Sequence, residues 1–254
     1  MTRGGRGLRL TVDCGNSRAK LALWGEGAEC VGGAAFAYGA DLVREVQAWL
    51  RDRPPIVLAG LSSVTTDVAS EALCEVLAER VGDLRIAPDP GLENRTRDPA
   101  GTGLDRLYAA RGALFHTGRA AIVVDVGSAM TVDAVLSEGG GAFLGGAIAP
   151  GPELSARALA REGARLFDVT PDPGARALGR DTAEAIGSGI AVGVRGAART
   201  LADEVAREAG IPDAPLALTG GARAFVRDAF PGRQVHEDAD LVHRGLLLAL
   251  EALP

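Results

Sequence analysis

The chain contains very little lysine, cysteine and aromatic side chain. Lys20 is its one lysine, and every other strongly basic residue is an arginine. Its three cysteines are an odd number without a Cys-x-x-Cys pair, which argues against disulfides and a zinc site and fits a reducing cytoplasm. No apolar run reaches the about 18 residues that a membrane-spanning helix needs. We therefore expect a cytoplasmic protein with no membrane partner.

Positive charge is also in deficit. The net charge of −6 argues against a broad basic surface, so a nucleic-acid partner is not expected. Glycine, by contrast, is abundant: 35 of the 254 residues, roughly twice the usual share. This excess predicts many tight turns or close backbone approaches. With 47% hydrophobic and 24% charged residues, the composition is that of a globular protein.

Along the first half of the chain, short apolar runs typical of strands alternate with segments whose apolar residues recur at helical spacing. Residues 8–24 are typical of a β-hairpin around a Gly-Asn-Ser turn. Further strands are expected at 55–64 and 84–88, a polar loop at 89–103, and helices over 39–53, 66–82 and 104–118.

The opening pattern returns at residues 120–136, where an apolar run again meets Asp-x-Gly. Asp13 and Asp125 are 112 residues apart, close to half the chain. The sequence therefore predicts an α/β protein of two duplicated halves, residues 1–118 and 119–254, that pack closely. In the second half we expect a strand at 141–151, helices at 151–163, 182–209 and 238–253, and a strand, Gly-Gly turn and helix over 214–230.

The turn after the first apolar run carries side chains suited to binding phosphate. Gly15 lets the backbone N–H groups of the turn approach a phosphate, and Asn16 and Ser17 add side-chain donors. Asp13 is able to hold Mg²⁺ directly or through water, and Lys20 supplies a compact positive charge. A plain hairpin turn is the alternative, because Asn and Gly suit such turns for conformational reasons alone. The repeat at half-chain spacing, with a further Gly-Gly turn in LTGGAR, favours the phosphate site.

A second candidate site lies in GTGLDRLYAA, where a glycine-rich loop meets a predicted helix. Asp105 would be ionised near neutral pH and able to accept a proton from a substrate hydroxyl, while Arg106 would bind a substrate anion. The alternative is that Asp105 is only the N-terminal cap of the helix.

Six motifs in order carry a family resemblance: DCGNSRAK, GLDR, DVGSAMTVD, GGAIAPG, DTAEAIGSG and LTGG. Together they resemble type III pantothenate kinases, of the acetate and sugar kinase/actin-like ATPase superfamily, from about residue 9 to residue 250. The resemblance implies two duplicated ribonuclease-H-like domains with an ATP cleft between them. It also implies a homodimer that phosphorylates pantothenate with ATP to 4′-phosphopantothenate, the first step of coenzyme A biosynthesis.

The resemblance also implies a role for individual residues. Asp105 would be the catalytic base. Asp125 would hold a monovalent cation, K⁺ or NH₄⁺, in addition to the Mg²⁺ expected at Asp13. The expected ATP contacts are Asp13, Gly15, Asn16, Ser17, Lys20, Ser128, Gly220 and Gly221. The expected pantothenate contacts are Gly103, Leu104, Asp105, Arg106, Thr96 and, from the partner subunit, Thr182.

Two departures from the family pattern concern side-chain type. The family often has threonine where this chain has Ser17 and Ser128, and serine keeps the hydroxyl. The family often has an aromatic residue seven positions before the glycine of GLDR, where this chain has Thr96, which bears on how the substrate is packed.

Two alternative functions remain at this stage. One is a kinase of the same superfamily for another small hydroxylated metabolite; its sugar-kinase branches suggest a longer chain or a zinc-binding cysteine cluster. The other is a non-catalytic regulatory relative, against which the presence of Asp13, Lys20, Asp105 and Asp125 argues.

Overall fold

The computed structural model describes residues 7–15, 17–63 and 68–252. Contacts between Cα atoms divide the chain into two compact units. The first comprises the chain up to Leu92, Ala100–Gly112 and Asp240 onward; the second comprises Glu93–Pro99 and Ala113–Ala239. No helix among the described residues combines the length and hydropathy needed to cross a membrane.

The first unit contains a five-stranded sheet of order β3-β2-β1-β4-β5. The first three strands are antiparallel neighbours, whereas β4 and β5 run parallel to β1. Their bounds are β1 Leu8–Cys14, β2 Arg18–Trp24, β3 Cys30–Ala37, β4 Ile56–Ser63 and β5 Leu84–Ile86. The predicted hairpin over residues 8–24 is thus β1 and β2.

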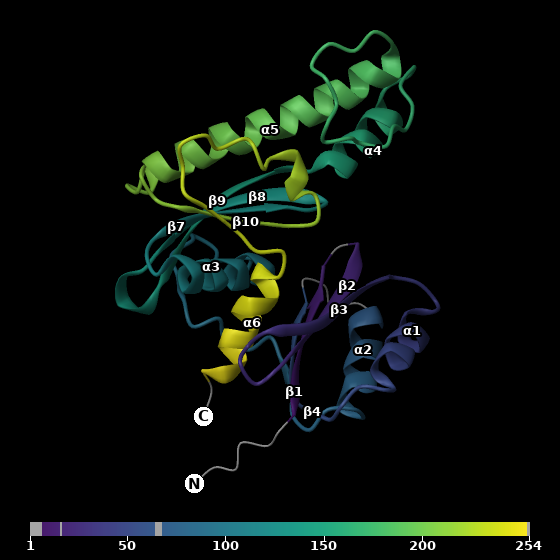
Figure 1. Cartoon of the computed structure of the whole chain (residues 1–254), viewed down its shortest axis with the longest axis vertical. Helices are drawn as coiled ribbons and strands as arrows, with labels where there is room; N and C mark the ends of the chain where they lie inside the picture. Colours follow the sequence, from purple (N-terminus) through teal and green to yellow (C-terminus); the bar gives the residue numbers. More distant parts are fainter. Residues whose placement is uncertain (1–6, 16, 64–67, 253–254) are drawn as a thin grey trace. The chain divides into compact units, whose positions relative to one another are not determined.

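Helices cover both faces of this sheet (Figure 1). The side chains of Leu10 and Val12 join the buried core with α1 (Leu42–Leu50) and α2 (Val68–Ala78). On the opposite face, Thr11 Oγ1 lies 2.9 Å from Nδ1 of His243, from helix α6 (Leu241–Glu251). Because both faces are covered, β1 is a continuous buried run rather than an alternating one.

Helix α6 also packs against α3 (Leu104–Thr117) at an unusually short distance. A Cβ on Gly245 of α6 would collide with the carbonyl oxygen of Tyr108, and one on Gly112 of α3 would lie 2.5 Å from the carbonyl oxygen of Leu241. Such a crossing leaves no room for side chains, which is one reason for the high glycine content.

The second unit contains a six-stranded sheet of order β11-β10-β7-β8-β9-β6. Without the two-residue β6, the remaining five strands repeat the order and directions of the first sheet, with β7 in the place of β1. Their bounds are β6 Glu93–Asn94, β7 Ala121–Val126, β8 Ala129–Leu136, β9 Ala142–Pro150, β10 Leu216–Thr219 and β11 Val235–Glu237. The predicted duplication of an α/β half is confirmed.

Two helices belong to the second unit, α4 (Pro152–Glu162) and the long α5 (Thr182–Glu208). Helix α5 lies along one face of the sheet (Figure 1), where Ile190, Val194 and Ala198 join the core with β7 and β8. A 3₁₀ turn, η1 (Glu138–Gly140), connects β8 to β9.

Several local expectations differ from the structure. The helix expected after the Gly-Gly turn is only a 3₁₀ turn, η2 (Arg223–Phe225). The expected loop at 89–103 contains β6, and no apolar pattern predicted β3 or β11. These strands are short or rich in glycine and alanine, so pairing with a neighbour, rather than strand propensity, forms them.

The division by contacts also differs from a single boundary near residue 118. Helix α6 packs on β1 and β4 of the first unit, and β6 pairs with β9 of the second. The chain therefore crosses between the units several times.

Candidate functional site

The end of the first hairpin places an acid opposite a base. Asp13, the penultimate residue of β1, is 5% exposed and is paired in register with Lys20 of β2. Directly opposite residues of antiparallel strands have Cβ atoms about 4.5–5.5 Å apart. Because Lys20 is exposed while Asp13 is buried, the ammonium group can reach a ligand over the strand end.

The turn that follows β1 is hydrogen-bonded by a side chain at the end of a third strand. The Tyr38 hydroxyl, from the residue after β3, donates a hydrogen bond of 2.7 Å to the carbonyl oxygen of Gly15. Ser17 is exposed at the far side of the turn. Asn16, also expected to contact ATP, lies outside the described residues. The remaining predicted members, Asp13, Gly15, Ser17 and Lys20, share one hairpin.

The GLDR motif forms the start of α3. The helix begins at Leu104, so Asp105 lies within its first turn and not at the N-terminal cap. Its Oδ1 accepts a hydrogen bond of 2.9 Å from the backbone N–H of Arg106. The carboxylate is half-buried, and so is Arg106. This arrangement fixes the Asp105 carboxylate while leaving it accessible to a substrate.

In the second unit, three predicted residues, Asp125, Gly220 and Gly221, are brought together at the end of the sheet. Asp125, the penultimate residue of β7, is in register with Thr131 of β8 and Thr219 of β10. Gly220 follows Thr219 with φ of 94°, and a Cβ there would collide with Asp125 Oδ1 and the carbonyl oxygen of Val126. Only glycine fits this position, both for its backbone conformation and for its space. Gly221 follows it and is exposed.

Ser128 lies in the β7–β8 turn, next to the start of α4. The backbone N–H of Gly151, which precedes α4, donates to the Ser128 carbonyl oxygen at 3.0 Å. The start of a helix offers unpaired N–H groups and a positive dipole end, which suits an anion. Sequence reasoning did not place Gly151 in the site, although the GGAIAPG motif contains it.

Arg223 is a second residue that sequence reasoning missed. Its Nη1 donates to the Gly220 carbonyl oxygen at 3.0 Å, and its Nε donates to Glu237 Oε1 at 2.7 Å. Arg227 donates to both oxygens of the same carboxylate, at 2.6 and 3.0 Å. The hydrogen bonds from Arg227 and Arg223 lower the pKa of Glu237 to about 2. The one sequence signal for Arg223 was its position directly after LTGGA.

The two remaining predicted substrate residues lie on other elements of the second unit. Thr96 follows β6, and its hydroxyl donates to Asn94 Oδ1 at 2.8 Å. Thr182 is the exposed first residue of α5, where the Asp181 side chain caps the helix through the Glu184 N–H. The family resemblance grouped both residues with the GLDR motif as pantothenate contacts, and that grouping stays a prediction.

The oxygen atoms of both hairpins suit hard cations. Among the described residues, no three His, Cys, Asp or Glu side chains gather as a metal site. Mg²⁺, however, typically uses one or two carboxylates, waters and substrate phosphates, which one buried Asp13 fits. Beside Gly220, the Asp125 carboxylate and the Val126 carbonyl bring two oxygen atoms close together, and carbonyl and carboxylate oxygens are ligands of K⁺.

Solved structures share this duplicated architecture. The EutJ ethanolamine utilization protein of Carboxydothermus hydrogenoformans has a TM-score of 0.56 at 18% identity and covers 98% of this chain and 91% of its own. The activator of 2-hydroxyisocaproyl-CoA dehydratase from Clostridium difficile, solved with bound ADPNP, has a TM-score of 0.51 at 12% identity, with coverages of 96% and 92%. The repeated sheet and its two acidic hairpins thus define an actin-like ATPase fold, which confirms the predicted fold class.

Sequence comparison gives the family. The profile described as type III pantothenate kinase matches residues 9–204. The type III pantothenate kinase of Thermus thermophilus is 36% identical over 252 residues, covering 94% of this chain and 96% of the relative. That of Maricaulis maris is 33% identical over 258 residues, with coverages of 94% and 95%. The chain belongs to the type III pantothenate kinase family.

Proposed function

We propose that Asp105 is the general base in the ATP-dependent phosphorylation of pantothenate, the reaction that family membership gives this chain. The substrate hydroxyl oxygen attacks the γ-phosphorus of ATP, and its proton passes to the Asp105 carboxylate. The new P–O bond forms as the bond to the β–γ bridging oxygen breaks, so the products are 4′-phosphopantothenate and ADP. The observation that supports this role is the carboxylate's fixed, half-buried place in the first turn of α3.

The ATP phosphates are proposed to bind at the two acidic hairpins. Lys20 and the N–H groups of the Gly15 turn would neutralise charge that develops on the leaving oxygen. Mg²⁺ at Asp13 and K⁺ at Asp125 would supply further positive charge. Ser17, Ser128 and the Gly220–Gly221 turn would complete the nucleotide site. The bound ADPNP of the Clostridium difficile protein, of the same fold, supports a nucleotide site on this architecture.

Arg106 would pair with the pantothenate carboxylate, next to Asp105 in the chain. Gly103 and Leu104 would contact the substrate through the same loop. Thr96 is proposed to line the pocket in place of the aromatic side chain often found there. It offers a methyl group and a hydroxyl already bonded to Asn94, so this wall of the pocket would be smaller.

ADP release in the presence of Mg²⁺, K⁺ and pantothenate tests the reaction, with mass spectrometry of the product. The absence of 4′-phosphopantothenate would refute it, and turnover of a sugar or sugar acid in its place would identify another metabolite kinase.

Asp105→Asn, which preserves shape and removes the basic oxygen, is expected to lower kcat by about 10²–10⁴-fold. ATP affinity, measured by calorimetry, should change little. An Asp105→Asn enzyme with wild-type kcat would remove Asp105 from this role.

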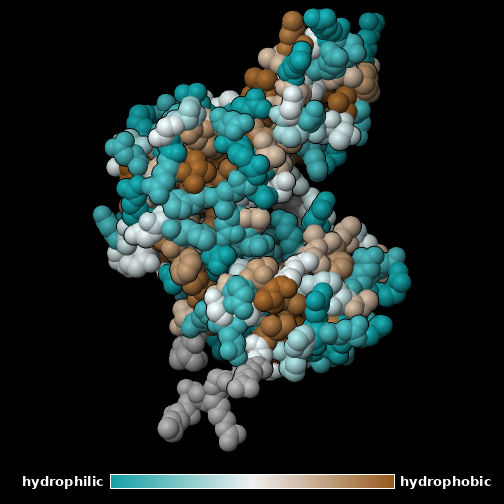
Figure 2. Space-filling view, viewed as in Figure 1, coloured by the Kyte–Doolittle hydropathy of each residue, from teal (hydrophilic) through white to brown (hydrophobic). Residues whose placement is uncertain are grey.

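A homodimer is the second part of the proposal, supported by an apolar face of the second unit. Exposed apolar side chains lie on α4, α5 and the segment between them: Leu154, Leu159, Phe167, Leu178 and Val192. Figure 2 shows hydrophobic surface in this region. A second copy would cover these side chains, and would bring its own Thr182, at the exposed start of α5, toward the substrate.

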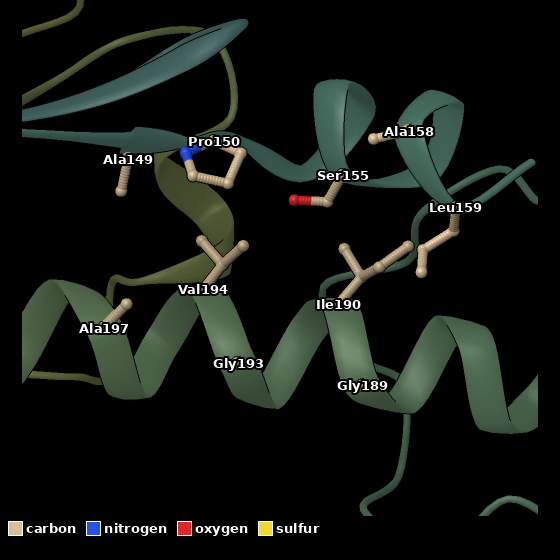
Figure 3. Close-up of a pocket in the computed structure, with 10 residues that line it drawn as sticks. All are labelled: Ala149, Pro150, Ser155, Ala158, Leu159, Gly189, Ile190, Gly193, Val194 and Ala197. Atoms are coloured by element: carbon tan, nitrogen blue, oxygen red, sulfur yellow. The ribbon is translucent and has the colours of Figure 1, made fainter. Parts of the chain in front are cut away.

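A pocket of about 370 Å³ opens between α4 and α5 on this face. In Figure 3, Ile190 and Val194 point from α5 toward Leu159 and Pro150, while Gly193 leaves the helix surface bare. No atom lies within 4 Å of a Cβ built on Gly193. A side chain at this position would therefore fit a single subunit and obstruct a second one.

Gly193→Leu separates the effect on the dimer from the effect on the fold, because leucine favours helix and a Cβ at this position meets no atom within 4 Å. Light scattering should show a dimer for the wild type and a monomer for Gly193→Leu, with helix content unchanged by circular dichroism. Arg199→Leu, at an exposed position about 120° around α5 from Gly193, serves as the control. A monomeric wild type at micromolar concentration would refute the dimer.

A further inference from the structure

We propose that Arg223, Glu237 and Arg227, here called the glycine-turn clamp, position the Gly220–Gly221 turn for ATP. The inference rests on the proposed nucleotide site and adds three positioning residues to it. None of the three is expected to touch the reacting atoms.

The Gly220–Gly221 turn is in direct contact with the end of β7. The left-handed backbone of Gly220 is pressed against Asp125 and Val126, so a shift of this turn would alter the end of β7 as well. The turn is tied to β7 by the Ala222 N–H, which donates to the Val126 carbonyl oxygen at 2.8 Å. A second tie is the bond of 3.0 Å from Arg223 to the Gly220 carbonyl oxygen.

Arg223 is in turn held by a carboxylate from another strand. Glu237 ends β11, the strand beside β10, and accepts from Nε of Arg223. A planar guanidinium fixed at one edge presents its other N–H groups in a set direction, which an isolated surface arginine does not. Arg227 donates to both oxygens of Glu237, so rotation of the carboxylate would break these two hydrogen bonds.

The charge state of the clamp is stable. The two guanidinium groups keep the pKa of Glu237 at about 2, so its carboxylate is ionised at every pH used for enzyme assays. The clamp is therefore a permanent support and not a pH switch. Lysine at position 223 would keep the charge but would lose one of the two simultaneous bonds.

Arg233 provides a matched control in the same unit. It also makes one ion pair, with Asp203 at 3.0 Å, and one bond to a backbone carbonyl, that of Ala214 at 2.9 Å. Ala214 precedes β10, whereas Gly220 follows it, so Arg233 supports the opposite end of the strand. Replacing either arginine should lower the free energy of unfolding by a similar amount, whereas only the replacement of Arg223 should weaken ATP binding.

The test is calorimetric binding of Mg²⁺–ADPNP without pantothenate, followed by steady-state kinetics. Arg223→Ala is expected to raise the Kd for ADPNP and the KM for ATP about five- to tenfold, and to leave the KM for pantothenate within about twofold. Arg233→Ala should leave all three constants within about twofold, and Arg223→Lys should recover part of the loss.

Equal binding by Arg223→Ala and wild type, or equal losses in Arg223→Ala and Arg233→Ala, would overturn the clamp. If Arg223→Ala does not fold by circular dichroism, Glu237→Gln takes its place, with an expected loss of about threefold. Binding needs no acceptor, so a protein that binds ADPNP but does not phosphorylate pantothenate refutes the proposed function alone.

Discussion

The two sheets of this protein have the same strand order, but the ends of their central strands carry different chemistry. In the first sheet, Asp13 is opposite a lysine; in the second, Asp125 is opposite Thr131. The side chain opposite the aspartate is therefore a cation in the first hairpin and a neutral hydroxyl in the second. The two aspartates hold equivalent positions in the repeat, and we propose that the side chains opposite them suit one hairpin to phosphate and the other to a bound cation.

The groups that hold the two turns differ in the same way. A neutral hydroxyl, from Tyr38, bonds the Gly15 carbonyl in the first unit. In the second unit, a guanidinium paired with Glu237 bonds the Gly220 carbonyl. A charged support is stronger and more directional than a neutral one, so we expect the second turn to be the more rigid.

Within this comparison of the two hairpins, replacing Lys20 is expected to have the largest effect. Lys20→Ala should lower kcat/KM for ATP by about 10²–10³-fold, because a preorganised charge on the phosphates is lost. Thr131→Ala, its counterpart in register, should change kcat/KM by less than about threefold. Equal effects in steady-state assays would show that the two hairpins are not specialised.

Lys20→Arg refines the same comparison. Arginine keeps the charge, but its wide guanidinium replaces a compact ammonium, so we expect roughly a tenfold loss. Wild-type kinetics in Lys20→Arg would mean that the single lysine of the chain is not required at this position.

Asp125→Asn is expected to have an intermediate effect. Loss of the carboxylate should abolish activation by KCl and lower kcat by about tenfold at saturating salt, because the amide lacks the charge that balances a cation. The measurement is a KCl titration at constant ionic strength, with Asp203→Asn, an exposed aspartate of α5, as control. Undiminished KCl activation would place the cation elsewhere.

The smallest expected effect concerns stability in acid. The pKa of Glu237 falls from 4.5 to about 2 on folding, so its contribution to stability is complete above pH 4.5 and is lost as the pH falls toward 2. The difference in unfolding free energy between wild type and Glu237→Gln should be constant from pH 7 to 4.5. Below pH 4.5 it should shrink, by less than about 1 kcal/mol in total because the pair is partly exposed. Urea unfolding at four pH values measures it, and a difference that grows in acid would contradict the assignment.

The periodicity and the repeat predicted most of the long elements. The hairpin at residues 8–24 and the long helix from Thr182 were foreseen because apolar patterns of period 2 or 3.6 are local properties. By contrast, β3 contains two glycines and three alanines and pairs only because β2 presents a free edge to it. The segment at η2 is a 3₁₀ turn and not an α-helix because its backbone N–H groups bond three residues back, Phe225 to Ala222 and Val226 to Arg223.

The order of motifs along the chain by itself determined the duplication, the two acidic hairpins and the position of Asp105. Each hairpin and the start of α3 depend on residues close together in the sequence, and the duplication depends on the recurrence of one such local pattern. Only the tertiary structure decided which distant side chains support them: Tyr38 at Gly15, and Glu237 with Arg223 at Gly220. Those contacts depend on how strands pair across the sheet, which no local pattern specifies.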